Sequence, residues 1–208
     1  MKRAGRSSLW GGGTAAVWLV LLGASFVSGP GTAAIVCNPA AVAVTLEGLS
    51  VNFVTNITGT LKTEPAGWDI SLFRGIAEPF VQGLYFFWPN RNGNFDNAGG
   101  VGNGDVYAAL LAGTPVGPNN SYVLDGSGGT AEPYANWHVT HSDRYLGVRF
   151  FNEATSTTNY GWVHLVTGPN NGFPATMNGY CYENTGAAIS AGATSTLGDL
   201  VFLDDFDL

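Results

Sequence analysis

Charged residues are scarce in this chain of 208 residues, which holds 8 Lys+Arg and 15 Asp+Glu and is 11% charged. The low basic content excludes the Lys/Arg surface that contacts nucleic-acid phosphates, so we expect no nucleic-acid partner. A hydrophobic share of 45% excludes a disordered chain, because such chains lack apolar surface. The 30 glycines follow no three-residue period, which excludes a collagen-like fibre.

The N-terminal region has the pattern of an export signal. Basic residues within the first six positions precede the apolar stretch Ala15–Val27, which is too short to span a bilayer. Thr32-Ala33-Ala34 supplies the small residues that signal peptidase requires, so we expect residues 1–34 to be a cleaved signal peptide. The alternative is a membrane anchor or a buried helix, which Gly29-Pro30-Gly31 would break. We expect a protein that is secreted or held on the outer cell surface, with no transmembrane helix after cleavage.

Cysteine is nearly absent, with Cys37 close to the expected cleavage site and Cys181 close to the C-terminus. An even cysteine count in an exported chain indicates a disulfide between them. Two free buried thiols are one alternative. Lipidation of Cys37 is another, although Val36 stands where lipoprotein processing needs a small residue.

Apolar alternation of period two recurs along the chain, separated by clusters of Gly, Asn and Pro. It places Leu146, Val148 and Phe150 on one strand face, and Met177 and Cys181 together on the inward face of another strand. The segment 105–111 is consistent with a strand or with one helical turn. The other expected strands are 42–54 with a turn at 47–48, 68–73, 84–88, 121–124, 135–141, 145–150, 160–166 and 175–183.

These short strands and turns predict an all-β fold: a single antiparallel β-sandwich or jelly-roll-like domain over residues 35–192. An acidic and aromatic tail follows over residues 193–208.

The later strands carry a resemblance. Tyr145-Leu146-Gly147-Val148-Arg149-Phe150, Tyr160-Gly161-Trp162 and Tyr180-Cys181-Tyr182-Glu183-Asn184 form a "YLGxRF…YGW…YxYEN" pattern. This pattern resembles a group of exported β-rich proteins of Gram-negative bacteria, many of which end in a PEP-CTERM sorting segment. The resemblance covers roughly residues 48–192 and implies export, without implying an activity.

The end of the chain departs from that group. After Gly192 there is no Pro-Glu-Pro triplet, hydrophobic helix or basic cluster, and the sequence closes with the acidic and aromatic run Gly198–Leu208. This run is similar to short acidic tails of other exported proteins, which implies a sorting or docking role. A solvated terminus or a final edge strand is the alternative.

The long Asn/Gly loop after residue 88 offers weak candidates for calcium binding. Asn92, Asn94, Asp96 and Asp105 supply oxygen ligands, but most are neutral amides and no bidentate Glu follows at the EF-hand spacing. A plain loop is the favoured interpretation, and we expect no other cofactor.

Histidine and carboxylate side chains give no recognisable catalytic motif. His138 and His141, on an extended strand, would point to opposite faces, which disfavours a zinc site. Asp69, Glu153 and Glu183 are available for glycosidase-type chemistry, but nothing in the sequence brings any two of them together. We therefore name no catalytic residue.

Aromatic residues are plentiful, and most must lie in the core. Trp88, Trp137 and Tyr134 adjoin loops, so they are our candidates for stacking on sugar rings. Three functions follow from the sequence. The first is a non-enzymatic extracellular or cell-surface protein of the matrix, of adhesion or of the envelope, with polysaccharide or envelope components as possible partners. The alternatives are a carbohydrate-binding module and a secreted hydrolase.

Overall fold

The computed structural model describes residues 33–75, 82–89, 98–124 and 133–195. The expected signal peptide, apart from its last two residues, the C-terminal run from residue 196, and the calcium candidates Asn92, Asn94 and Asp96 lie outside these ranges. Within them the chain is all-β. Its strands are β1 Ile35–Asn38, β2 Val42–Val44, β3 Leu49–Asn52, β4 Ile57–Gly59, β5 Ile70–Gly75, β6 Gly83–Phe87, β7 Gly99–Asn103, β8 Val106–Tyr107, β9 Pro115–Val116, β10 Tyr122–Val123, β11 His141–Asn152, β12 Thr157–Gly168, β13 Gly172–Glu183 and β14 Ile189–Ser190.

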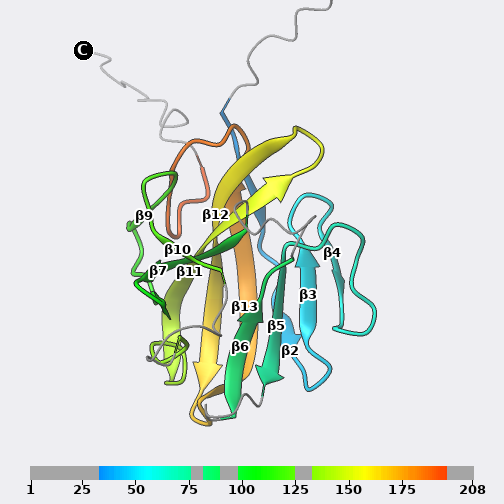
Figure 1. Cartoon of the computed structure of the whole chain (residues 1–208), viewed down its shortest axis with the longest axis vertical. Helices are drawn as coiled ribbons and strands as arrows, with labels where there is room; N and C mark the ends of the chain where they lie inside the picture. Colours follow the sequence, from blue (N-terminus) through cyan, green and yellow to red (C-terminus); the bar gives the residue numbers. More distant parts are fainter. Residues whose placement is uncertain (1–32, 76–81, 90–97, 125–132, 196–208) are drawn as a thin grey trace, which may run out of the picture. The chain divides into compact units, whose positions relative to one another are not determined.

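The strands form antiparallel sheets that confirm the predicted β-sandwich (Figure 1). The large sheet has the order β1-β13-β12-β11-β7-β10, with β2 added to β13 and β8 added to β7. The small sheet has the order β4-β3-β5-β6, and β14 pairs with β9 in a third, two-stranded sheet. The long strands β11, β12 and β13 of 12 residues each are joined by two hairpins.

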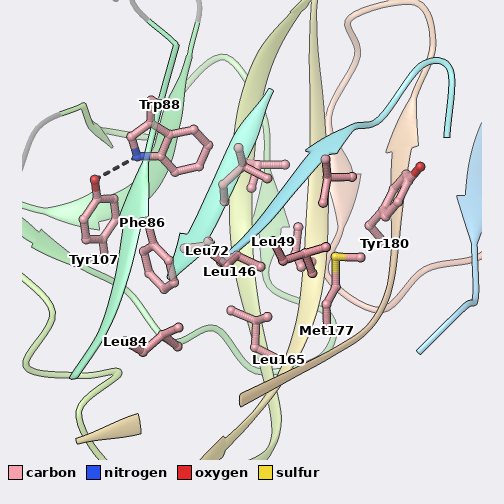
Figure 2. Packing of buried hydrophobic residues seen from close by; sticks show 14 of the residues in the cluster. Leu49, Leu72, Leu84, Phe86, Trp88, Tyr107, Leu146, Leu165, Met177 and Tyr180 are labelled. Atoms are coloured by element: carbon pink, nitrogen blue, oxygen red, sulfur yellow. Dashed lines mark hydrogen bonds between the residues drawn. The ribbon is translucent and has the colours of Figure 1, made fainter. Parts of the chain in front are cut away.

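The main core fills the space between the large and small sheets (Figure 2). Leu146, Val148 and Phe150 of β11 all lie in it, so the predicted face of that strand is confirmed. Leu49 and Leu72 pair across β3 and β5 of the small sheet and enter the same core. Alternation in both sheets thus directs one set of side chains into a shared interior.

A second core covers the opposite face of the large sheet. The sequence did not predict a core on this face. Trp162 and Cys181 lie in it together with Val116 of β9 and Ile189 of β14. The Trp162 Nε1–H donates a hydrogen bond to the Ala193 carbonyl oxygen at 3.0 Å, which ties the chain after β14 to the sheet. The large sheet is therefore buried on both faces over this region.

A bulge in β13 corrects one expectation. Between the pairs Val163↔Tyr180 and Leu165↔Met177, β13 advances three residues while β12 advances two. The extra residue reverses the alternation, so Met177 enters the main core while Cys181 enters the second core. The prediction that these two side chains share one face is therefore wrong.

The predicted disulfide is present between Cys37 and Cys181, which are direct partners across β1 and β13 with a Cα–Cα distance of 4.1 Å. Next to it, Asn184 Oδ1 accepts a hydrogen bond from the Ala34 N–H at 2.9 Å. Both interactions fix the first strand against the last long strand. No helix in the described part of the chain is long and apolar enough to cross a membrane.

Candidate functional site

The segment 133–140 between β10 and β11 is a series of turns, and the predicted strand over 135–141 is wrong. The Tyr134 carbonyl oxygen accepts hydrogen bonds from the N–H groups of Trp137 at 2.7 Å and His138 at 2.9 Å, which is the geometry of a helical turn. Local apolar alternation suggested a strand here. The backbone groups instead bond to one another within the turn and form no ladder with a neighbouring strand. We call this segment the 133–140 turn.

The 133–140 turn closes the free edge of β6. Tyr134 Oη donates a hydrogen bond to the Phe86 carbonyl oxygen at 3.1 Å, and His138 Nε2–H donates to the Leu84 carbonyl oxygen at 2.9 Å. The Leu84 N–H donates to the Asn171 carbonyl oxygen at 2.9 Å. Two side chains of the turn and the Asn171 backbone thus satisfy backbone groups that a further strand would otherwise satisfy, so the turn is held in place and β6 is protected from strand addition.

The three predicted sugar-stacking residues are buried in the core, which corrects that prediction. Trp88, Trp137 and Tyr134 are 1%, 0% and 5% exposed. Trp88 Nε1–H donates to Tyr107 Oη at 2.8 Å (Figure 2), and the Tyr134 ring packs on the Tyr85 ring with centroids 4.4 Å apart. Sequence adjacency to a loop was misleading, because the Trp137 and Tyr134 rings of the turn and the Trp88 ring directly after β6 all lie in the main core, which their large apolar area stabilises.

An open surface hollow of about 450 Å³ lies beside the 133–140 turn. Small side chains make part of its wall, and an amide, an imidazole and a guanidinium supply its polar groups. The lining residues are Ala108, Ala109, Ala135, Asn136, Val139, His141 and Arg144.

A second bulge brings the polar residues of this hollow together. Between the pairs His141↔Thr167 and Arg144↔Leu165, β11 advances three residues while β12 advances two. Residues three apart on a regular strand point to opposite faces, but the bulge returns His141 and Arg144 to the same side. Both therefore line one hollow, although the sequence predicted no strand that contains both residues.

All three histidines are held by backbone carbonyl groups. His141 Nε2–H donates to the Asn136 carbonyl oxygen at 2.7 Å, and His164 Nε2–H donates to the Ser142 carbonyl oxygen at 3.3 Å. His138 Nε2–H donates to the Leu84 carbonyl oxygen, as described above. Among the residues that the structure describes, no group of three or more His, Cys, Asp or Glu side chains is arranged to hold a metal. Asp105, the one calcium candidate described, lies exposed in the β7–β8 turn.

The buried carboxylates hold the backbone. Glu183 is 3% exposed, and its two oxygens accept hydrogen bonds from the Thr185 N–H at 2.9 Å, the Thr185 hydroxyl at 2.8 Å and the Ala187 N–H at 2.7 Å. Asp69, which is 1% exposed, accepts a bond from the Phe53 N–H at 2.8 Å. These contacts order the chain after β13 and the end of β3. Glu153, at the β11–β12 hairpin, is exposed.

Burial perturbs the tyrosines near Asp69. Burial raises the pKa of Tyr180 to about 12, and the neighbouring Tyr182 and Asp69 act in the same direction, whereas a hydrogen bond from Asn38 opposes it. Burial followed by the charge of Asp69 also raises the pKa of Tyr182. Both phenols are therefore neutral at ordinary pH, and the Tyr180 hydroxyl donates a hydrogen bond to the Phe53 carbonyl oxygen at 3.2 Å.

A partly exposed aromatic pair joins β6 of the small sheet to the residues before β5, and the sequence did not single it out. The Trp68 and Phe87 rings stack with centroids 5.6 Å apart and planes 26° apart, and Phe87 is 51% exposed. Phe87 belongs to the unbroken apolar run 84–88, so alternation gave no sign that its ring faces solvent. A partly exposed ring of this kind can stack on a sugar.

Comparisons of the chain with protein-family models, curated proteins and solved structures find no match.

Proposed function

We propose that this chain is an exported, non-enzymatic protein of the cell exterior that serves in the matrix, in adhesion or in the envelope. It would be related to the exported β-rich proteins with the "YLGxRF…YGW…YxYEN" pattern. The observation that carries the proposal is the Cys37–Cys181 disulfide. Disulfides form and persist in oxidising compartments outside the cytosol.

The position of β1 supports the same proposal. This strand begins at Ile35, directly after the expected cleavage site at Ala34, and it pairs along its whole length with β13. Cleavage at that site would remove the hydrogen bonding between Ala34 and Asn184 but would leave every strand and the disulfide intact. The use of Glu183 and Asp69 as backbone acceptors supports a non-enzymatic role, because these carboxylates already serve the fold.

Expression of the full chain in a Gram-negative host tests the proposal. We expect a protein outside the cytoplasm whose N-terminal residue is Ile35 and whose two cysteines resist alkylation until a reductant is added. A cytoplasmic product that retains residues 1–34 and carries two reactive thiols would overturn it. A Cys37→Ser variant is the control for alkylation, because it leaves Cys181 free to react.

Carbohydrate binding is the second candidate, and the Trp68–Phe87 pair favours it. Phe87→Ala is expected to weaken retention on the polysaccharide that the protein binds best in a panel of insoluble polysaccharides. Leu111→Ala is the matched control, since Leu111 is 57% exposed and lies outside the small sheet. Equal retention of both variants would exclude this pair as the binding surface.

A further inference from the structure

We propose that the hollow beside the 133–140 turn binds an acidic sugar, with Arg144 bound to the carboxylate of a uronic acid unit. The inference deepens the proposed exterior function by naming a partner, and it rests on that function for access to extracellular polysaccharide. It depends on the bulge at the start of β11, which places His141 and Arg144 on one side of the strand.

Arg144 has donors available for a ligand. Its Nη1 bonds to the Asp143 Oδ1 at 2.7 Å and lies 3.5 Å from the Asp143 carbonyl oxygen. Within the described chain, no hydrogen bond involves its Nε or Nη2. A guanidinium with two adjacent free donors matches the two oxygens of a carboxylate.

The internal ion pair of Arg144 is a weak competitor. Asp143 is its neighbour in sequence, and the Asp143 side chain is 73% exposed. Exposed pairs of this kind contribute about 0–1 kcal/mol, so a ligand carboxylate can share or replace the contact. No residue that lines the hollow is acidic, although the whole chain has a net charge of −7. The lining of the hollow therefore has one cation, paired only with an exposed carboxylate outside the lining, and this cation favours an anionic ligand.

The remaining lining residues select a hydroxylated acid. Asn136 uses its amide Nδ2 to donate to the Tyr107 carbonyl oxygen at 2.8 Å, and its Oδ1 accepts no bond from the described chain. His141 donates from Nε2, which leaves Nδ1 of the neutral ring as an acceptor. Two acceptors beside a cation fit a ligand that carries hydroxyl groups as well as a carboxylate.

The apolar part of the wall fits the C–H face of a sugar ring. Ala108, Ala109 and Ala135 leave space, and Val139 presents a side chain that is 47% exposed. The volume of about 450 Å³ exceeds what one carboxylate requires and falls in the range of small-ligand sites. Because the hollow is open, a polysaccharide chain can continue beyond the bound unit.

Calorimetric titration of the oxidised full chain with trigalacturonate tests the proposal. We expect saturable binding that weakens as salt is added, because the main contact is between charges. The methyl-esterified trisaccharide keeps the hydroxyl groups and the rings but loses the negative charges. Its affinity should be lower by at least about tenfold. Succinate carries carboxylates without hydroxyl groups, and it should also bind more weakly than trigalacturonate.

Matched variants test the residues. Arg144→Gln should weaken trigalacturonate binding by about tenfold, because it removes the charge while retaining a donor. Asp143→Asn should strengthen binding, because it frees Arg144. Arg74→Gln removes one positive charge elsewhere on the surface, as a control for Arg144→Gln, and Glu47→Gln removes one negative charge, as a control for Asp143→Asn. Neither control should change the affinity by more than about twofold.

Each contrary result overturns the inference. These results are the absence of binding at millimolar trigalacturonate, equal binding of the methyl ester, equal binding of succinate, and equal loss from Arg144→Gln and Arg74→Gln. Because the titration uses purified oxidised protein, its failure leaves the export and disulfide results standing. Conversely, a cytoplasmic location would refute the proposed function while leaving the measured affinity unchanged.

Discussion

Met177 and Cys181 are four residues apart in β13, yet their side chains lie in different cores on opposite faces of the large sheet. The bulge between the Val163 and Leu165 pairs produces this reversal, and Gly179 lies within it at φ +110°. Because of this single extra residue, Cys181 and its directly opposed partner Cys37 lie on the face of the second core. The bulge therefore decides which core the disulfide adjoins.

Gly179→Ala should destabilise the protein by about 2–3 kcal/mol, because a side chain strains the backbone at this φ. The added Cβ would also lie 2.6 Å from the Asn38 carbonyl oxygen, so β1 would have to move. Urea unfolding of the oxidised protein measures the change. Gly104→Ala is the control, since Gly104 has φ +59° with open space around it, and its expected cost is about 1 kcal/mol. Equal costs would contradict the steric argument.

Removal of the disulfide by Cys37→Ala with Cys181→Ala should lower the free energy of unfolding by about 4–5 kcal/mol. The bond joins residues 144 apart in sequence, and the chain-entropy model gives a large effect for so long a loop. Urea unfolding of the double variant measures the loss, and the reduced parent protein should show a similar value. A decrease of less than about 1 kcal/mol in the free energy of unfolding would show that the denatured chain gains little conformational freedom when the disulfide is removed.

Glu183→Gln should destabilise the protein by about 2 kcal/mol, because it weakens charge-assisted bonds to Thr185 and Ala187 and directs an amide N–H toward donors. Thermal unfolding at neutral pH checks the change. Glu47→Gln, in the exposed turn between β2 and β3, should change stability by less than about 0.5 kcal/mol. If both variants unfold alike, the carboxylate of Glu183 does not order the chain after β13.

Stability should fall as pH rises from about 10 to about 12. The pKa of Tyr180 is about 12 in the folded protein and 10.0 in its ordinary state. A raised pKa means that the unfolded chain loses the proton first, so this contribution is complete below pH 10 and is lost as pH approaches 12. Urea unfolding across this range should show the decline, and Tyr180→Phe should reduce its slope. An unchanged slope in the variant would assign the pH dependence to other groups.

The sequence predicted the architecture best where side chains alternate strictly. Leu146, Val148 and Phe150 follow the pleat of β11, and turn residues mark both hairpins, so strands and fold class were recoverable. The bulges in β11 and β13 could not be predicted from the sequence. One extra residue changes the face of every following side chain while it leaves the apolar composition unchanged.

The candidate site was the least predictable part. Trp137 and Tyr134 adjoin a loop in sequence, but long-range bonds to β6 and the surrounding rings bury them. His141 and Arg144 line one hollow because of a bulge whose position depends on pairing with Thr167 and Leu165. Such pairings join distant parts of the chain, and local patterns carry no information about them.

The disulfide also determines how the domain would respond to mechanical load. Tension applied between the N-terminal residue left by cleavage and the chain after β13 would enter at Cys37, cross to Cys181 and leave through the residues that follow Cys181. Residues 38–180 lie within the covalently closed loop and would carry no tension while the bond is intact. The short segments outside the loop, including the one held by the Trp162–Ala193 hydrogen bond, could extend, whereas the parts of both main sheets inside the loop would be shielded from stretching.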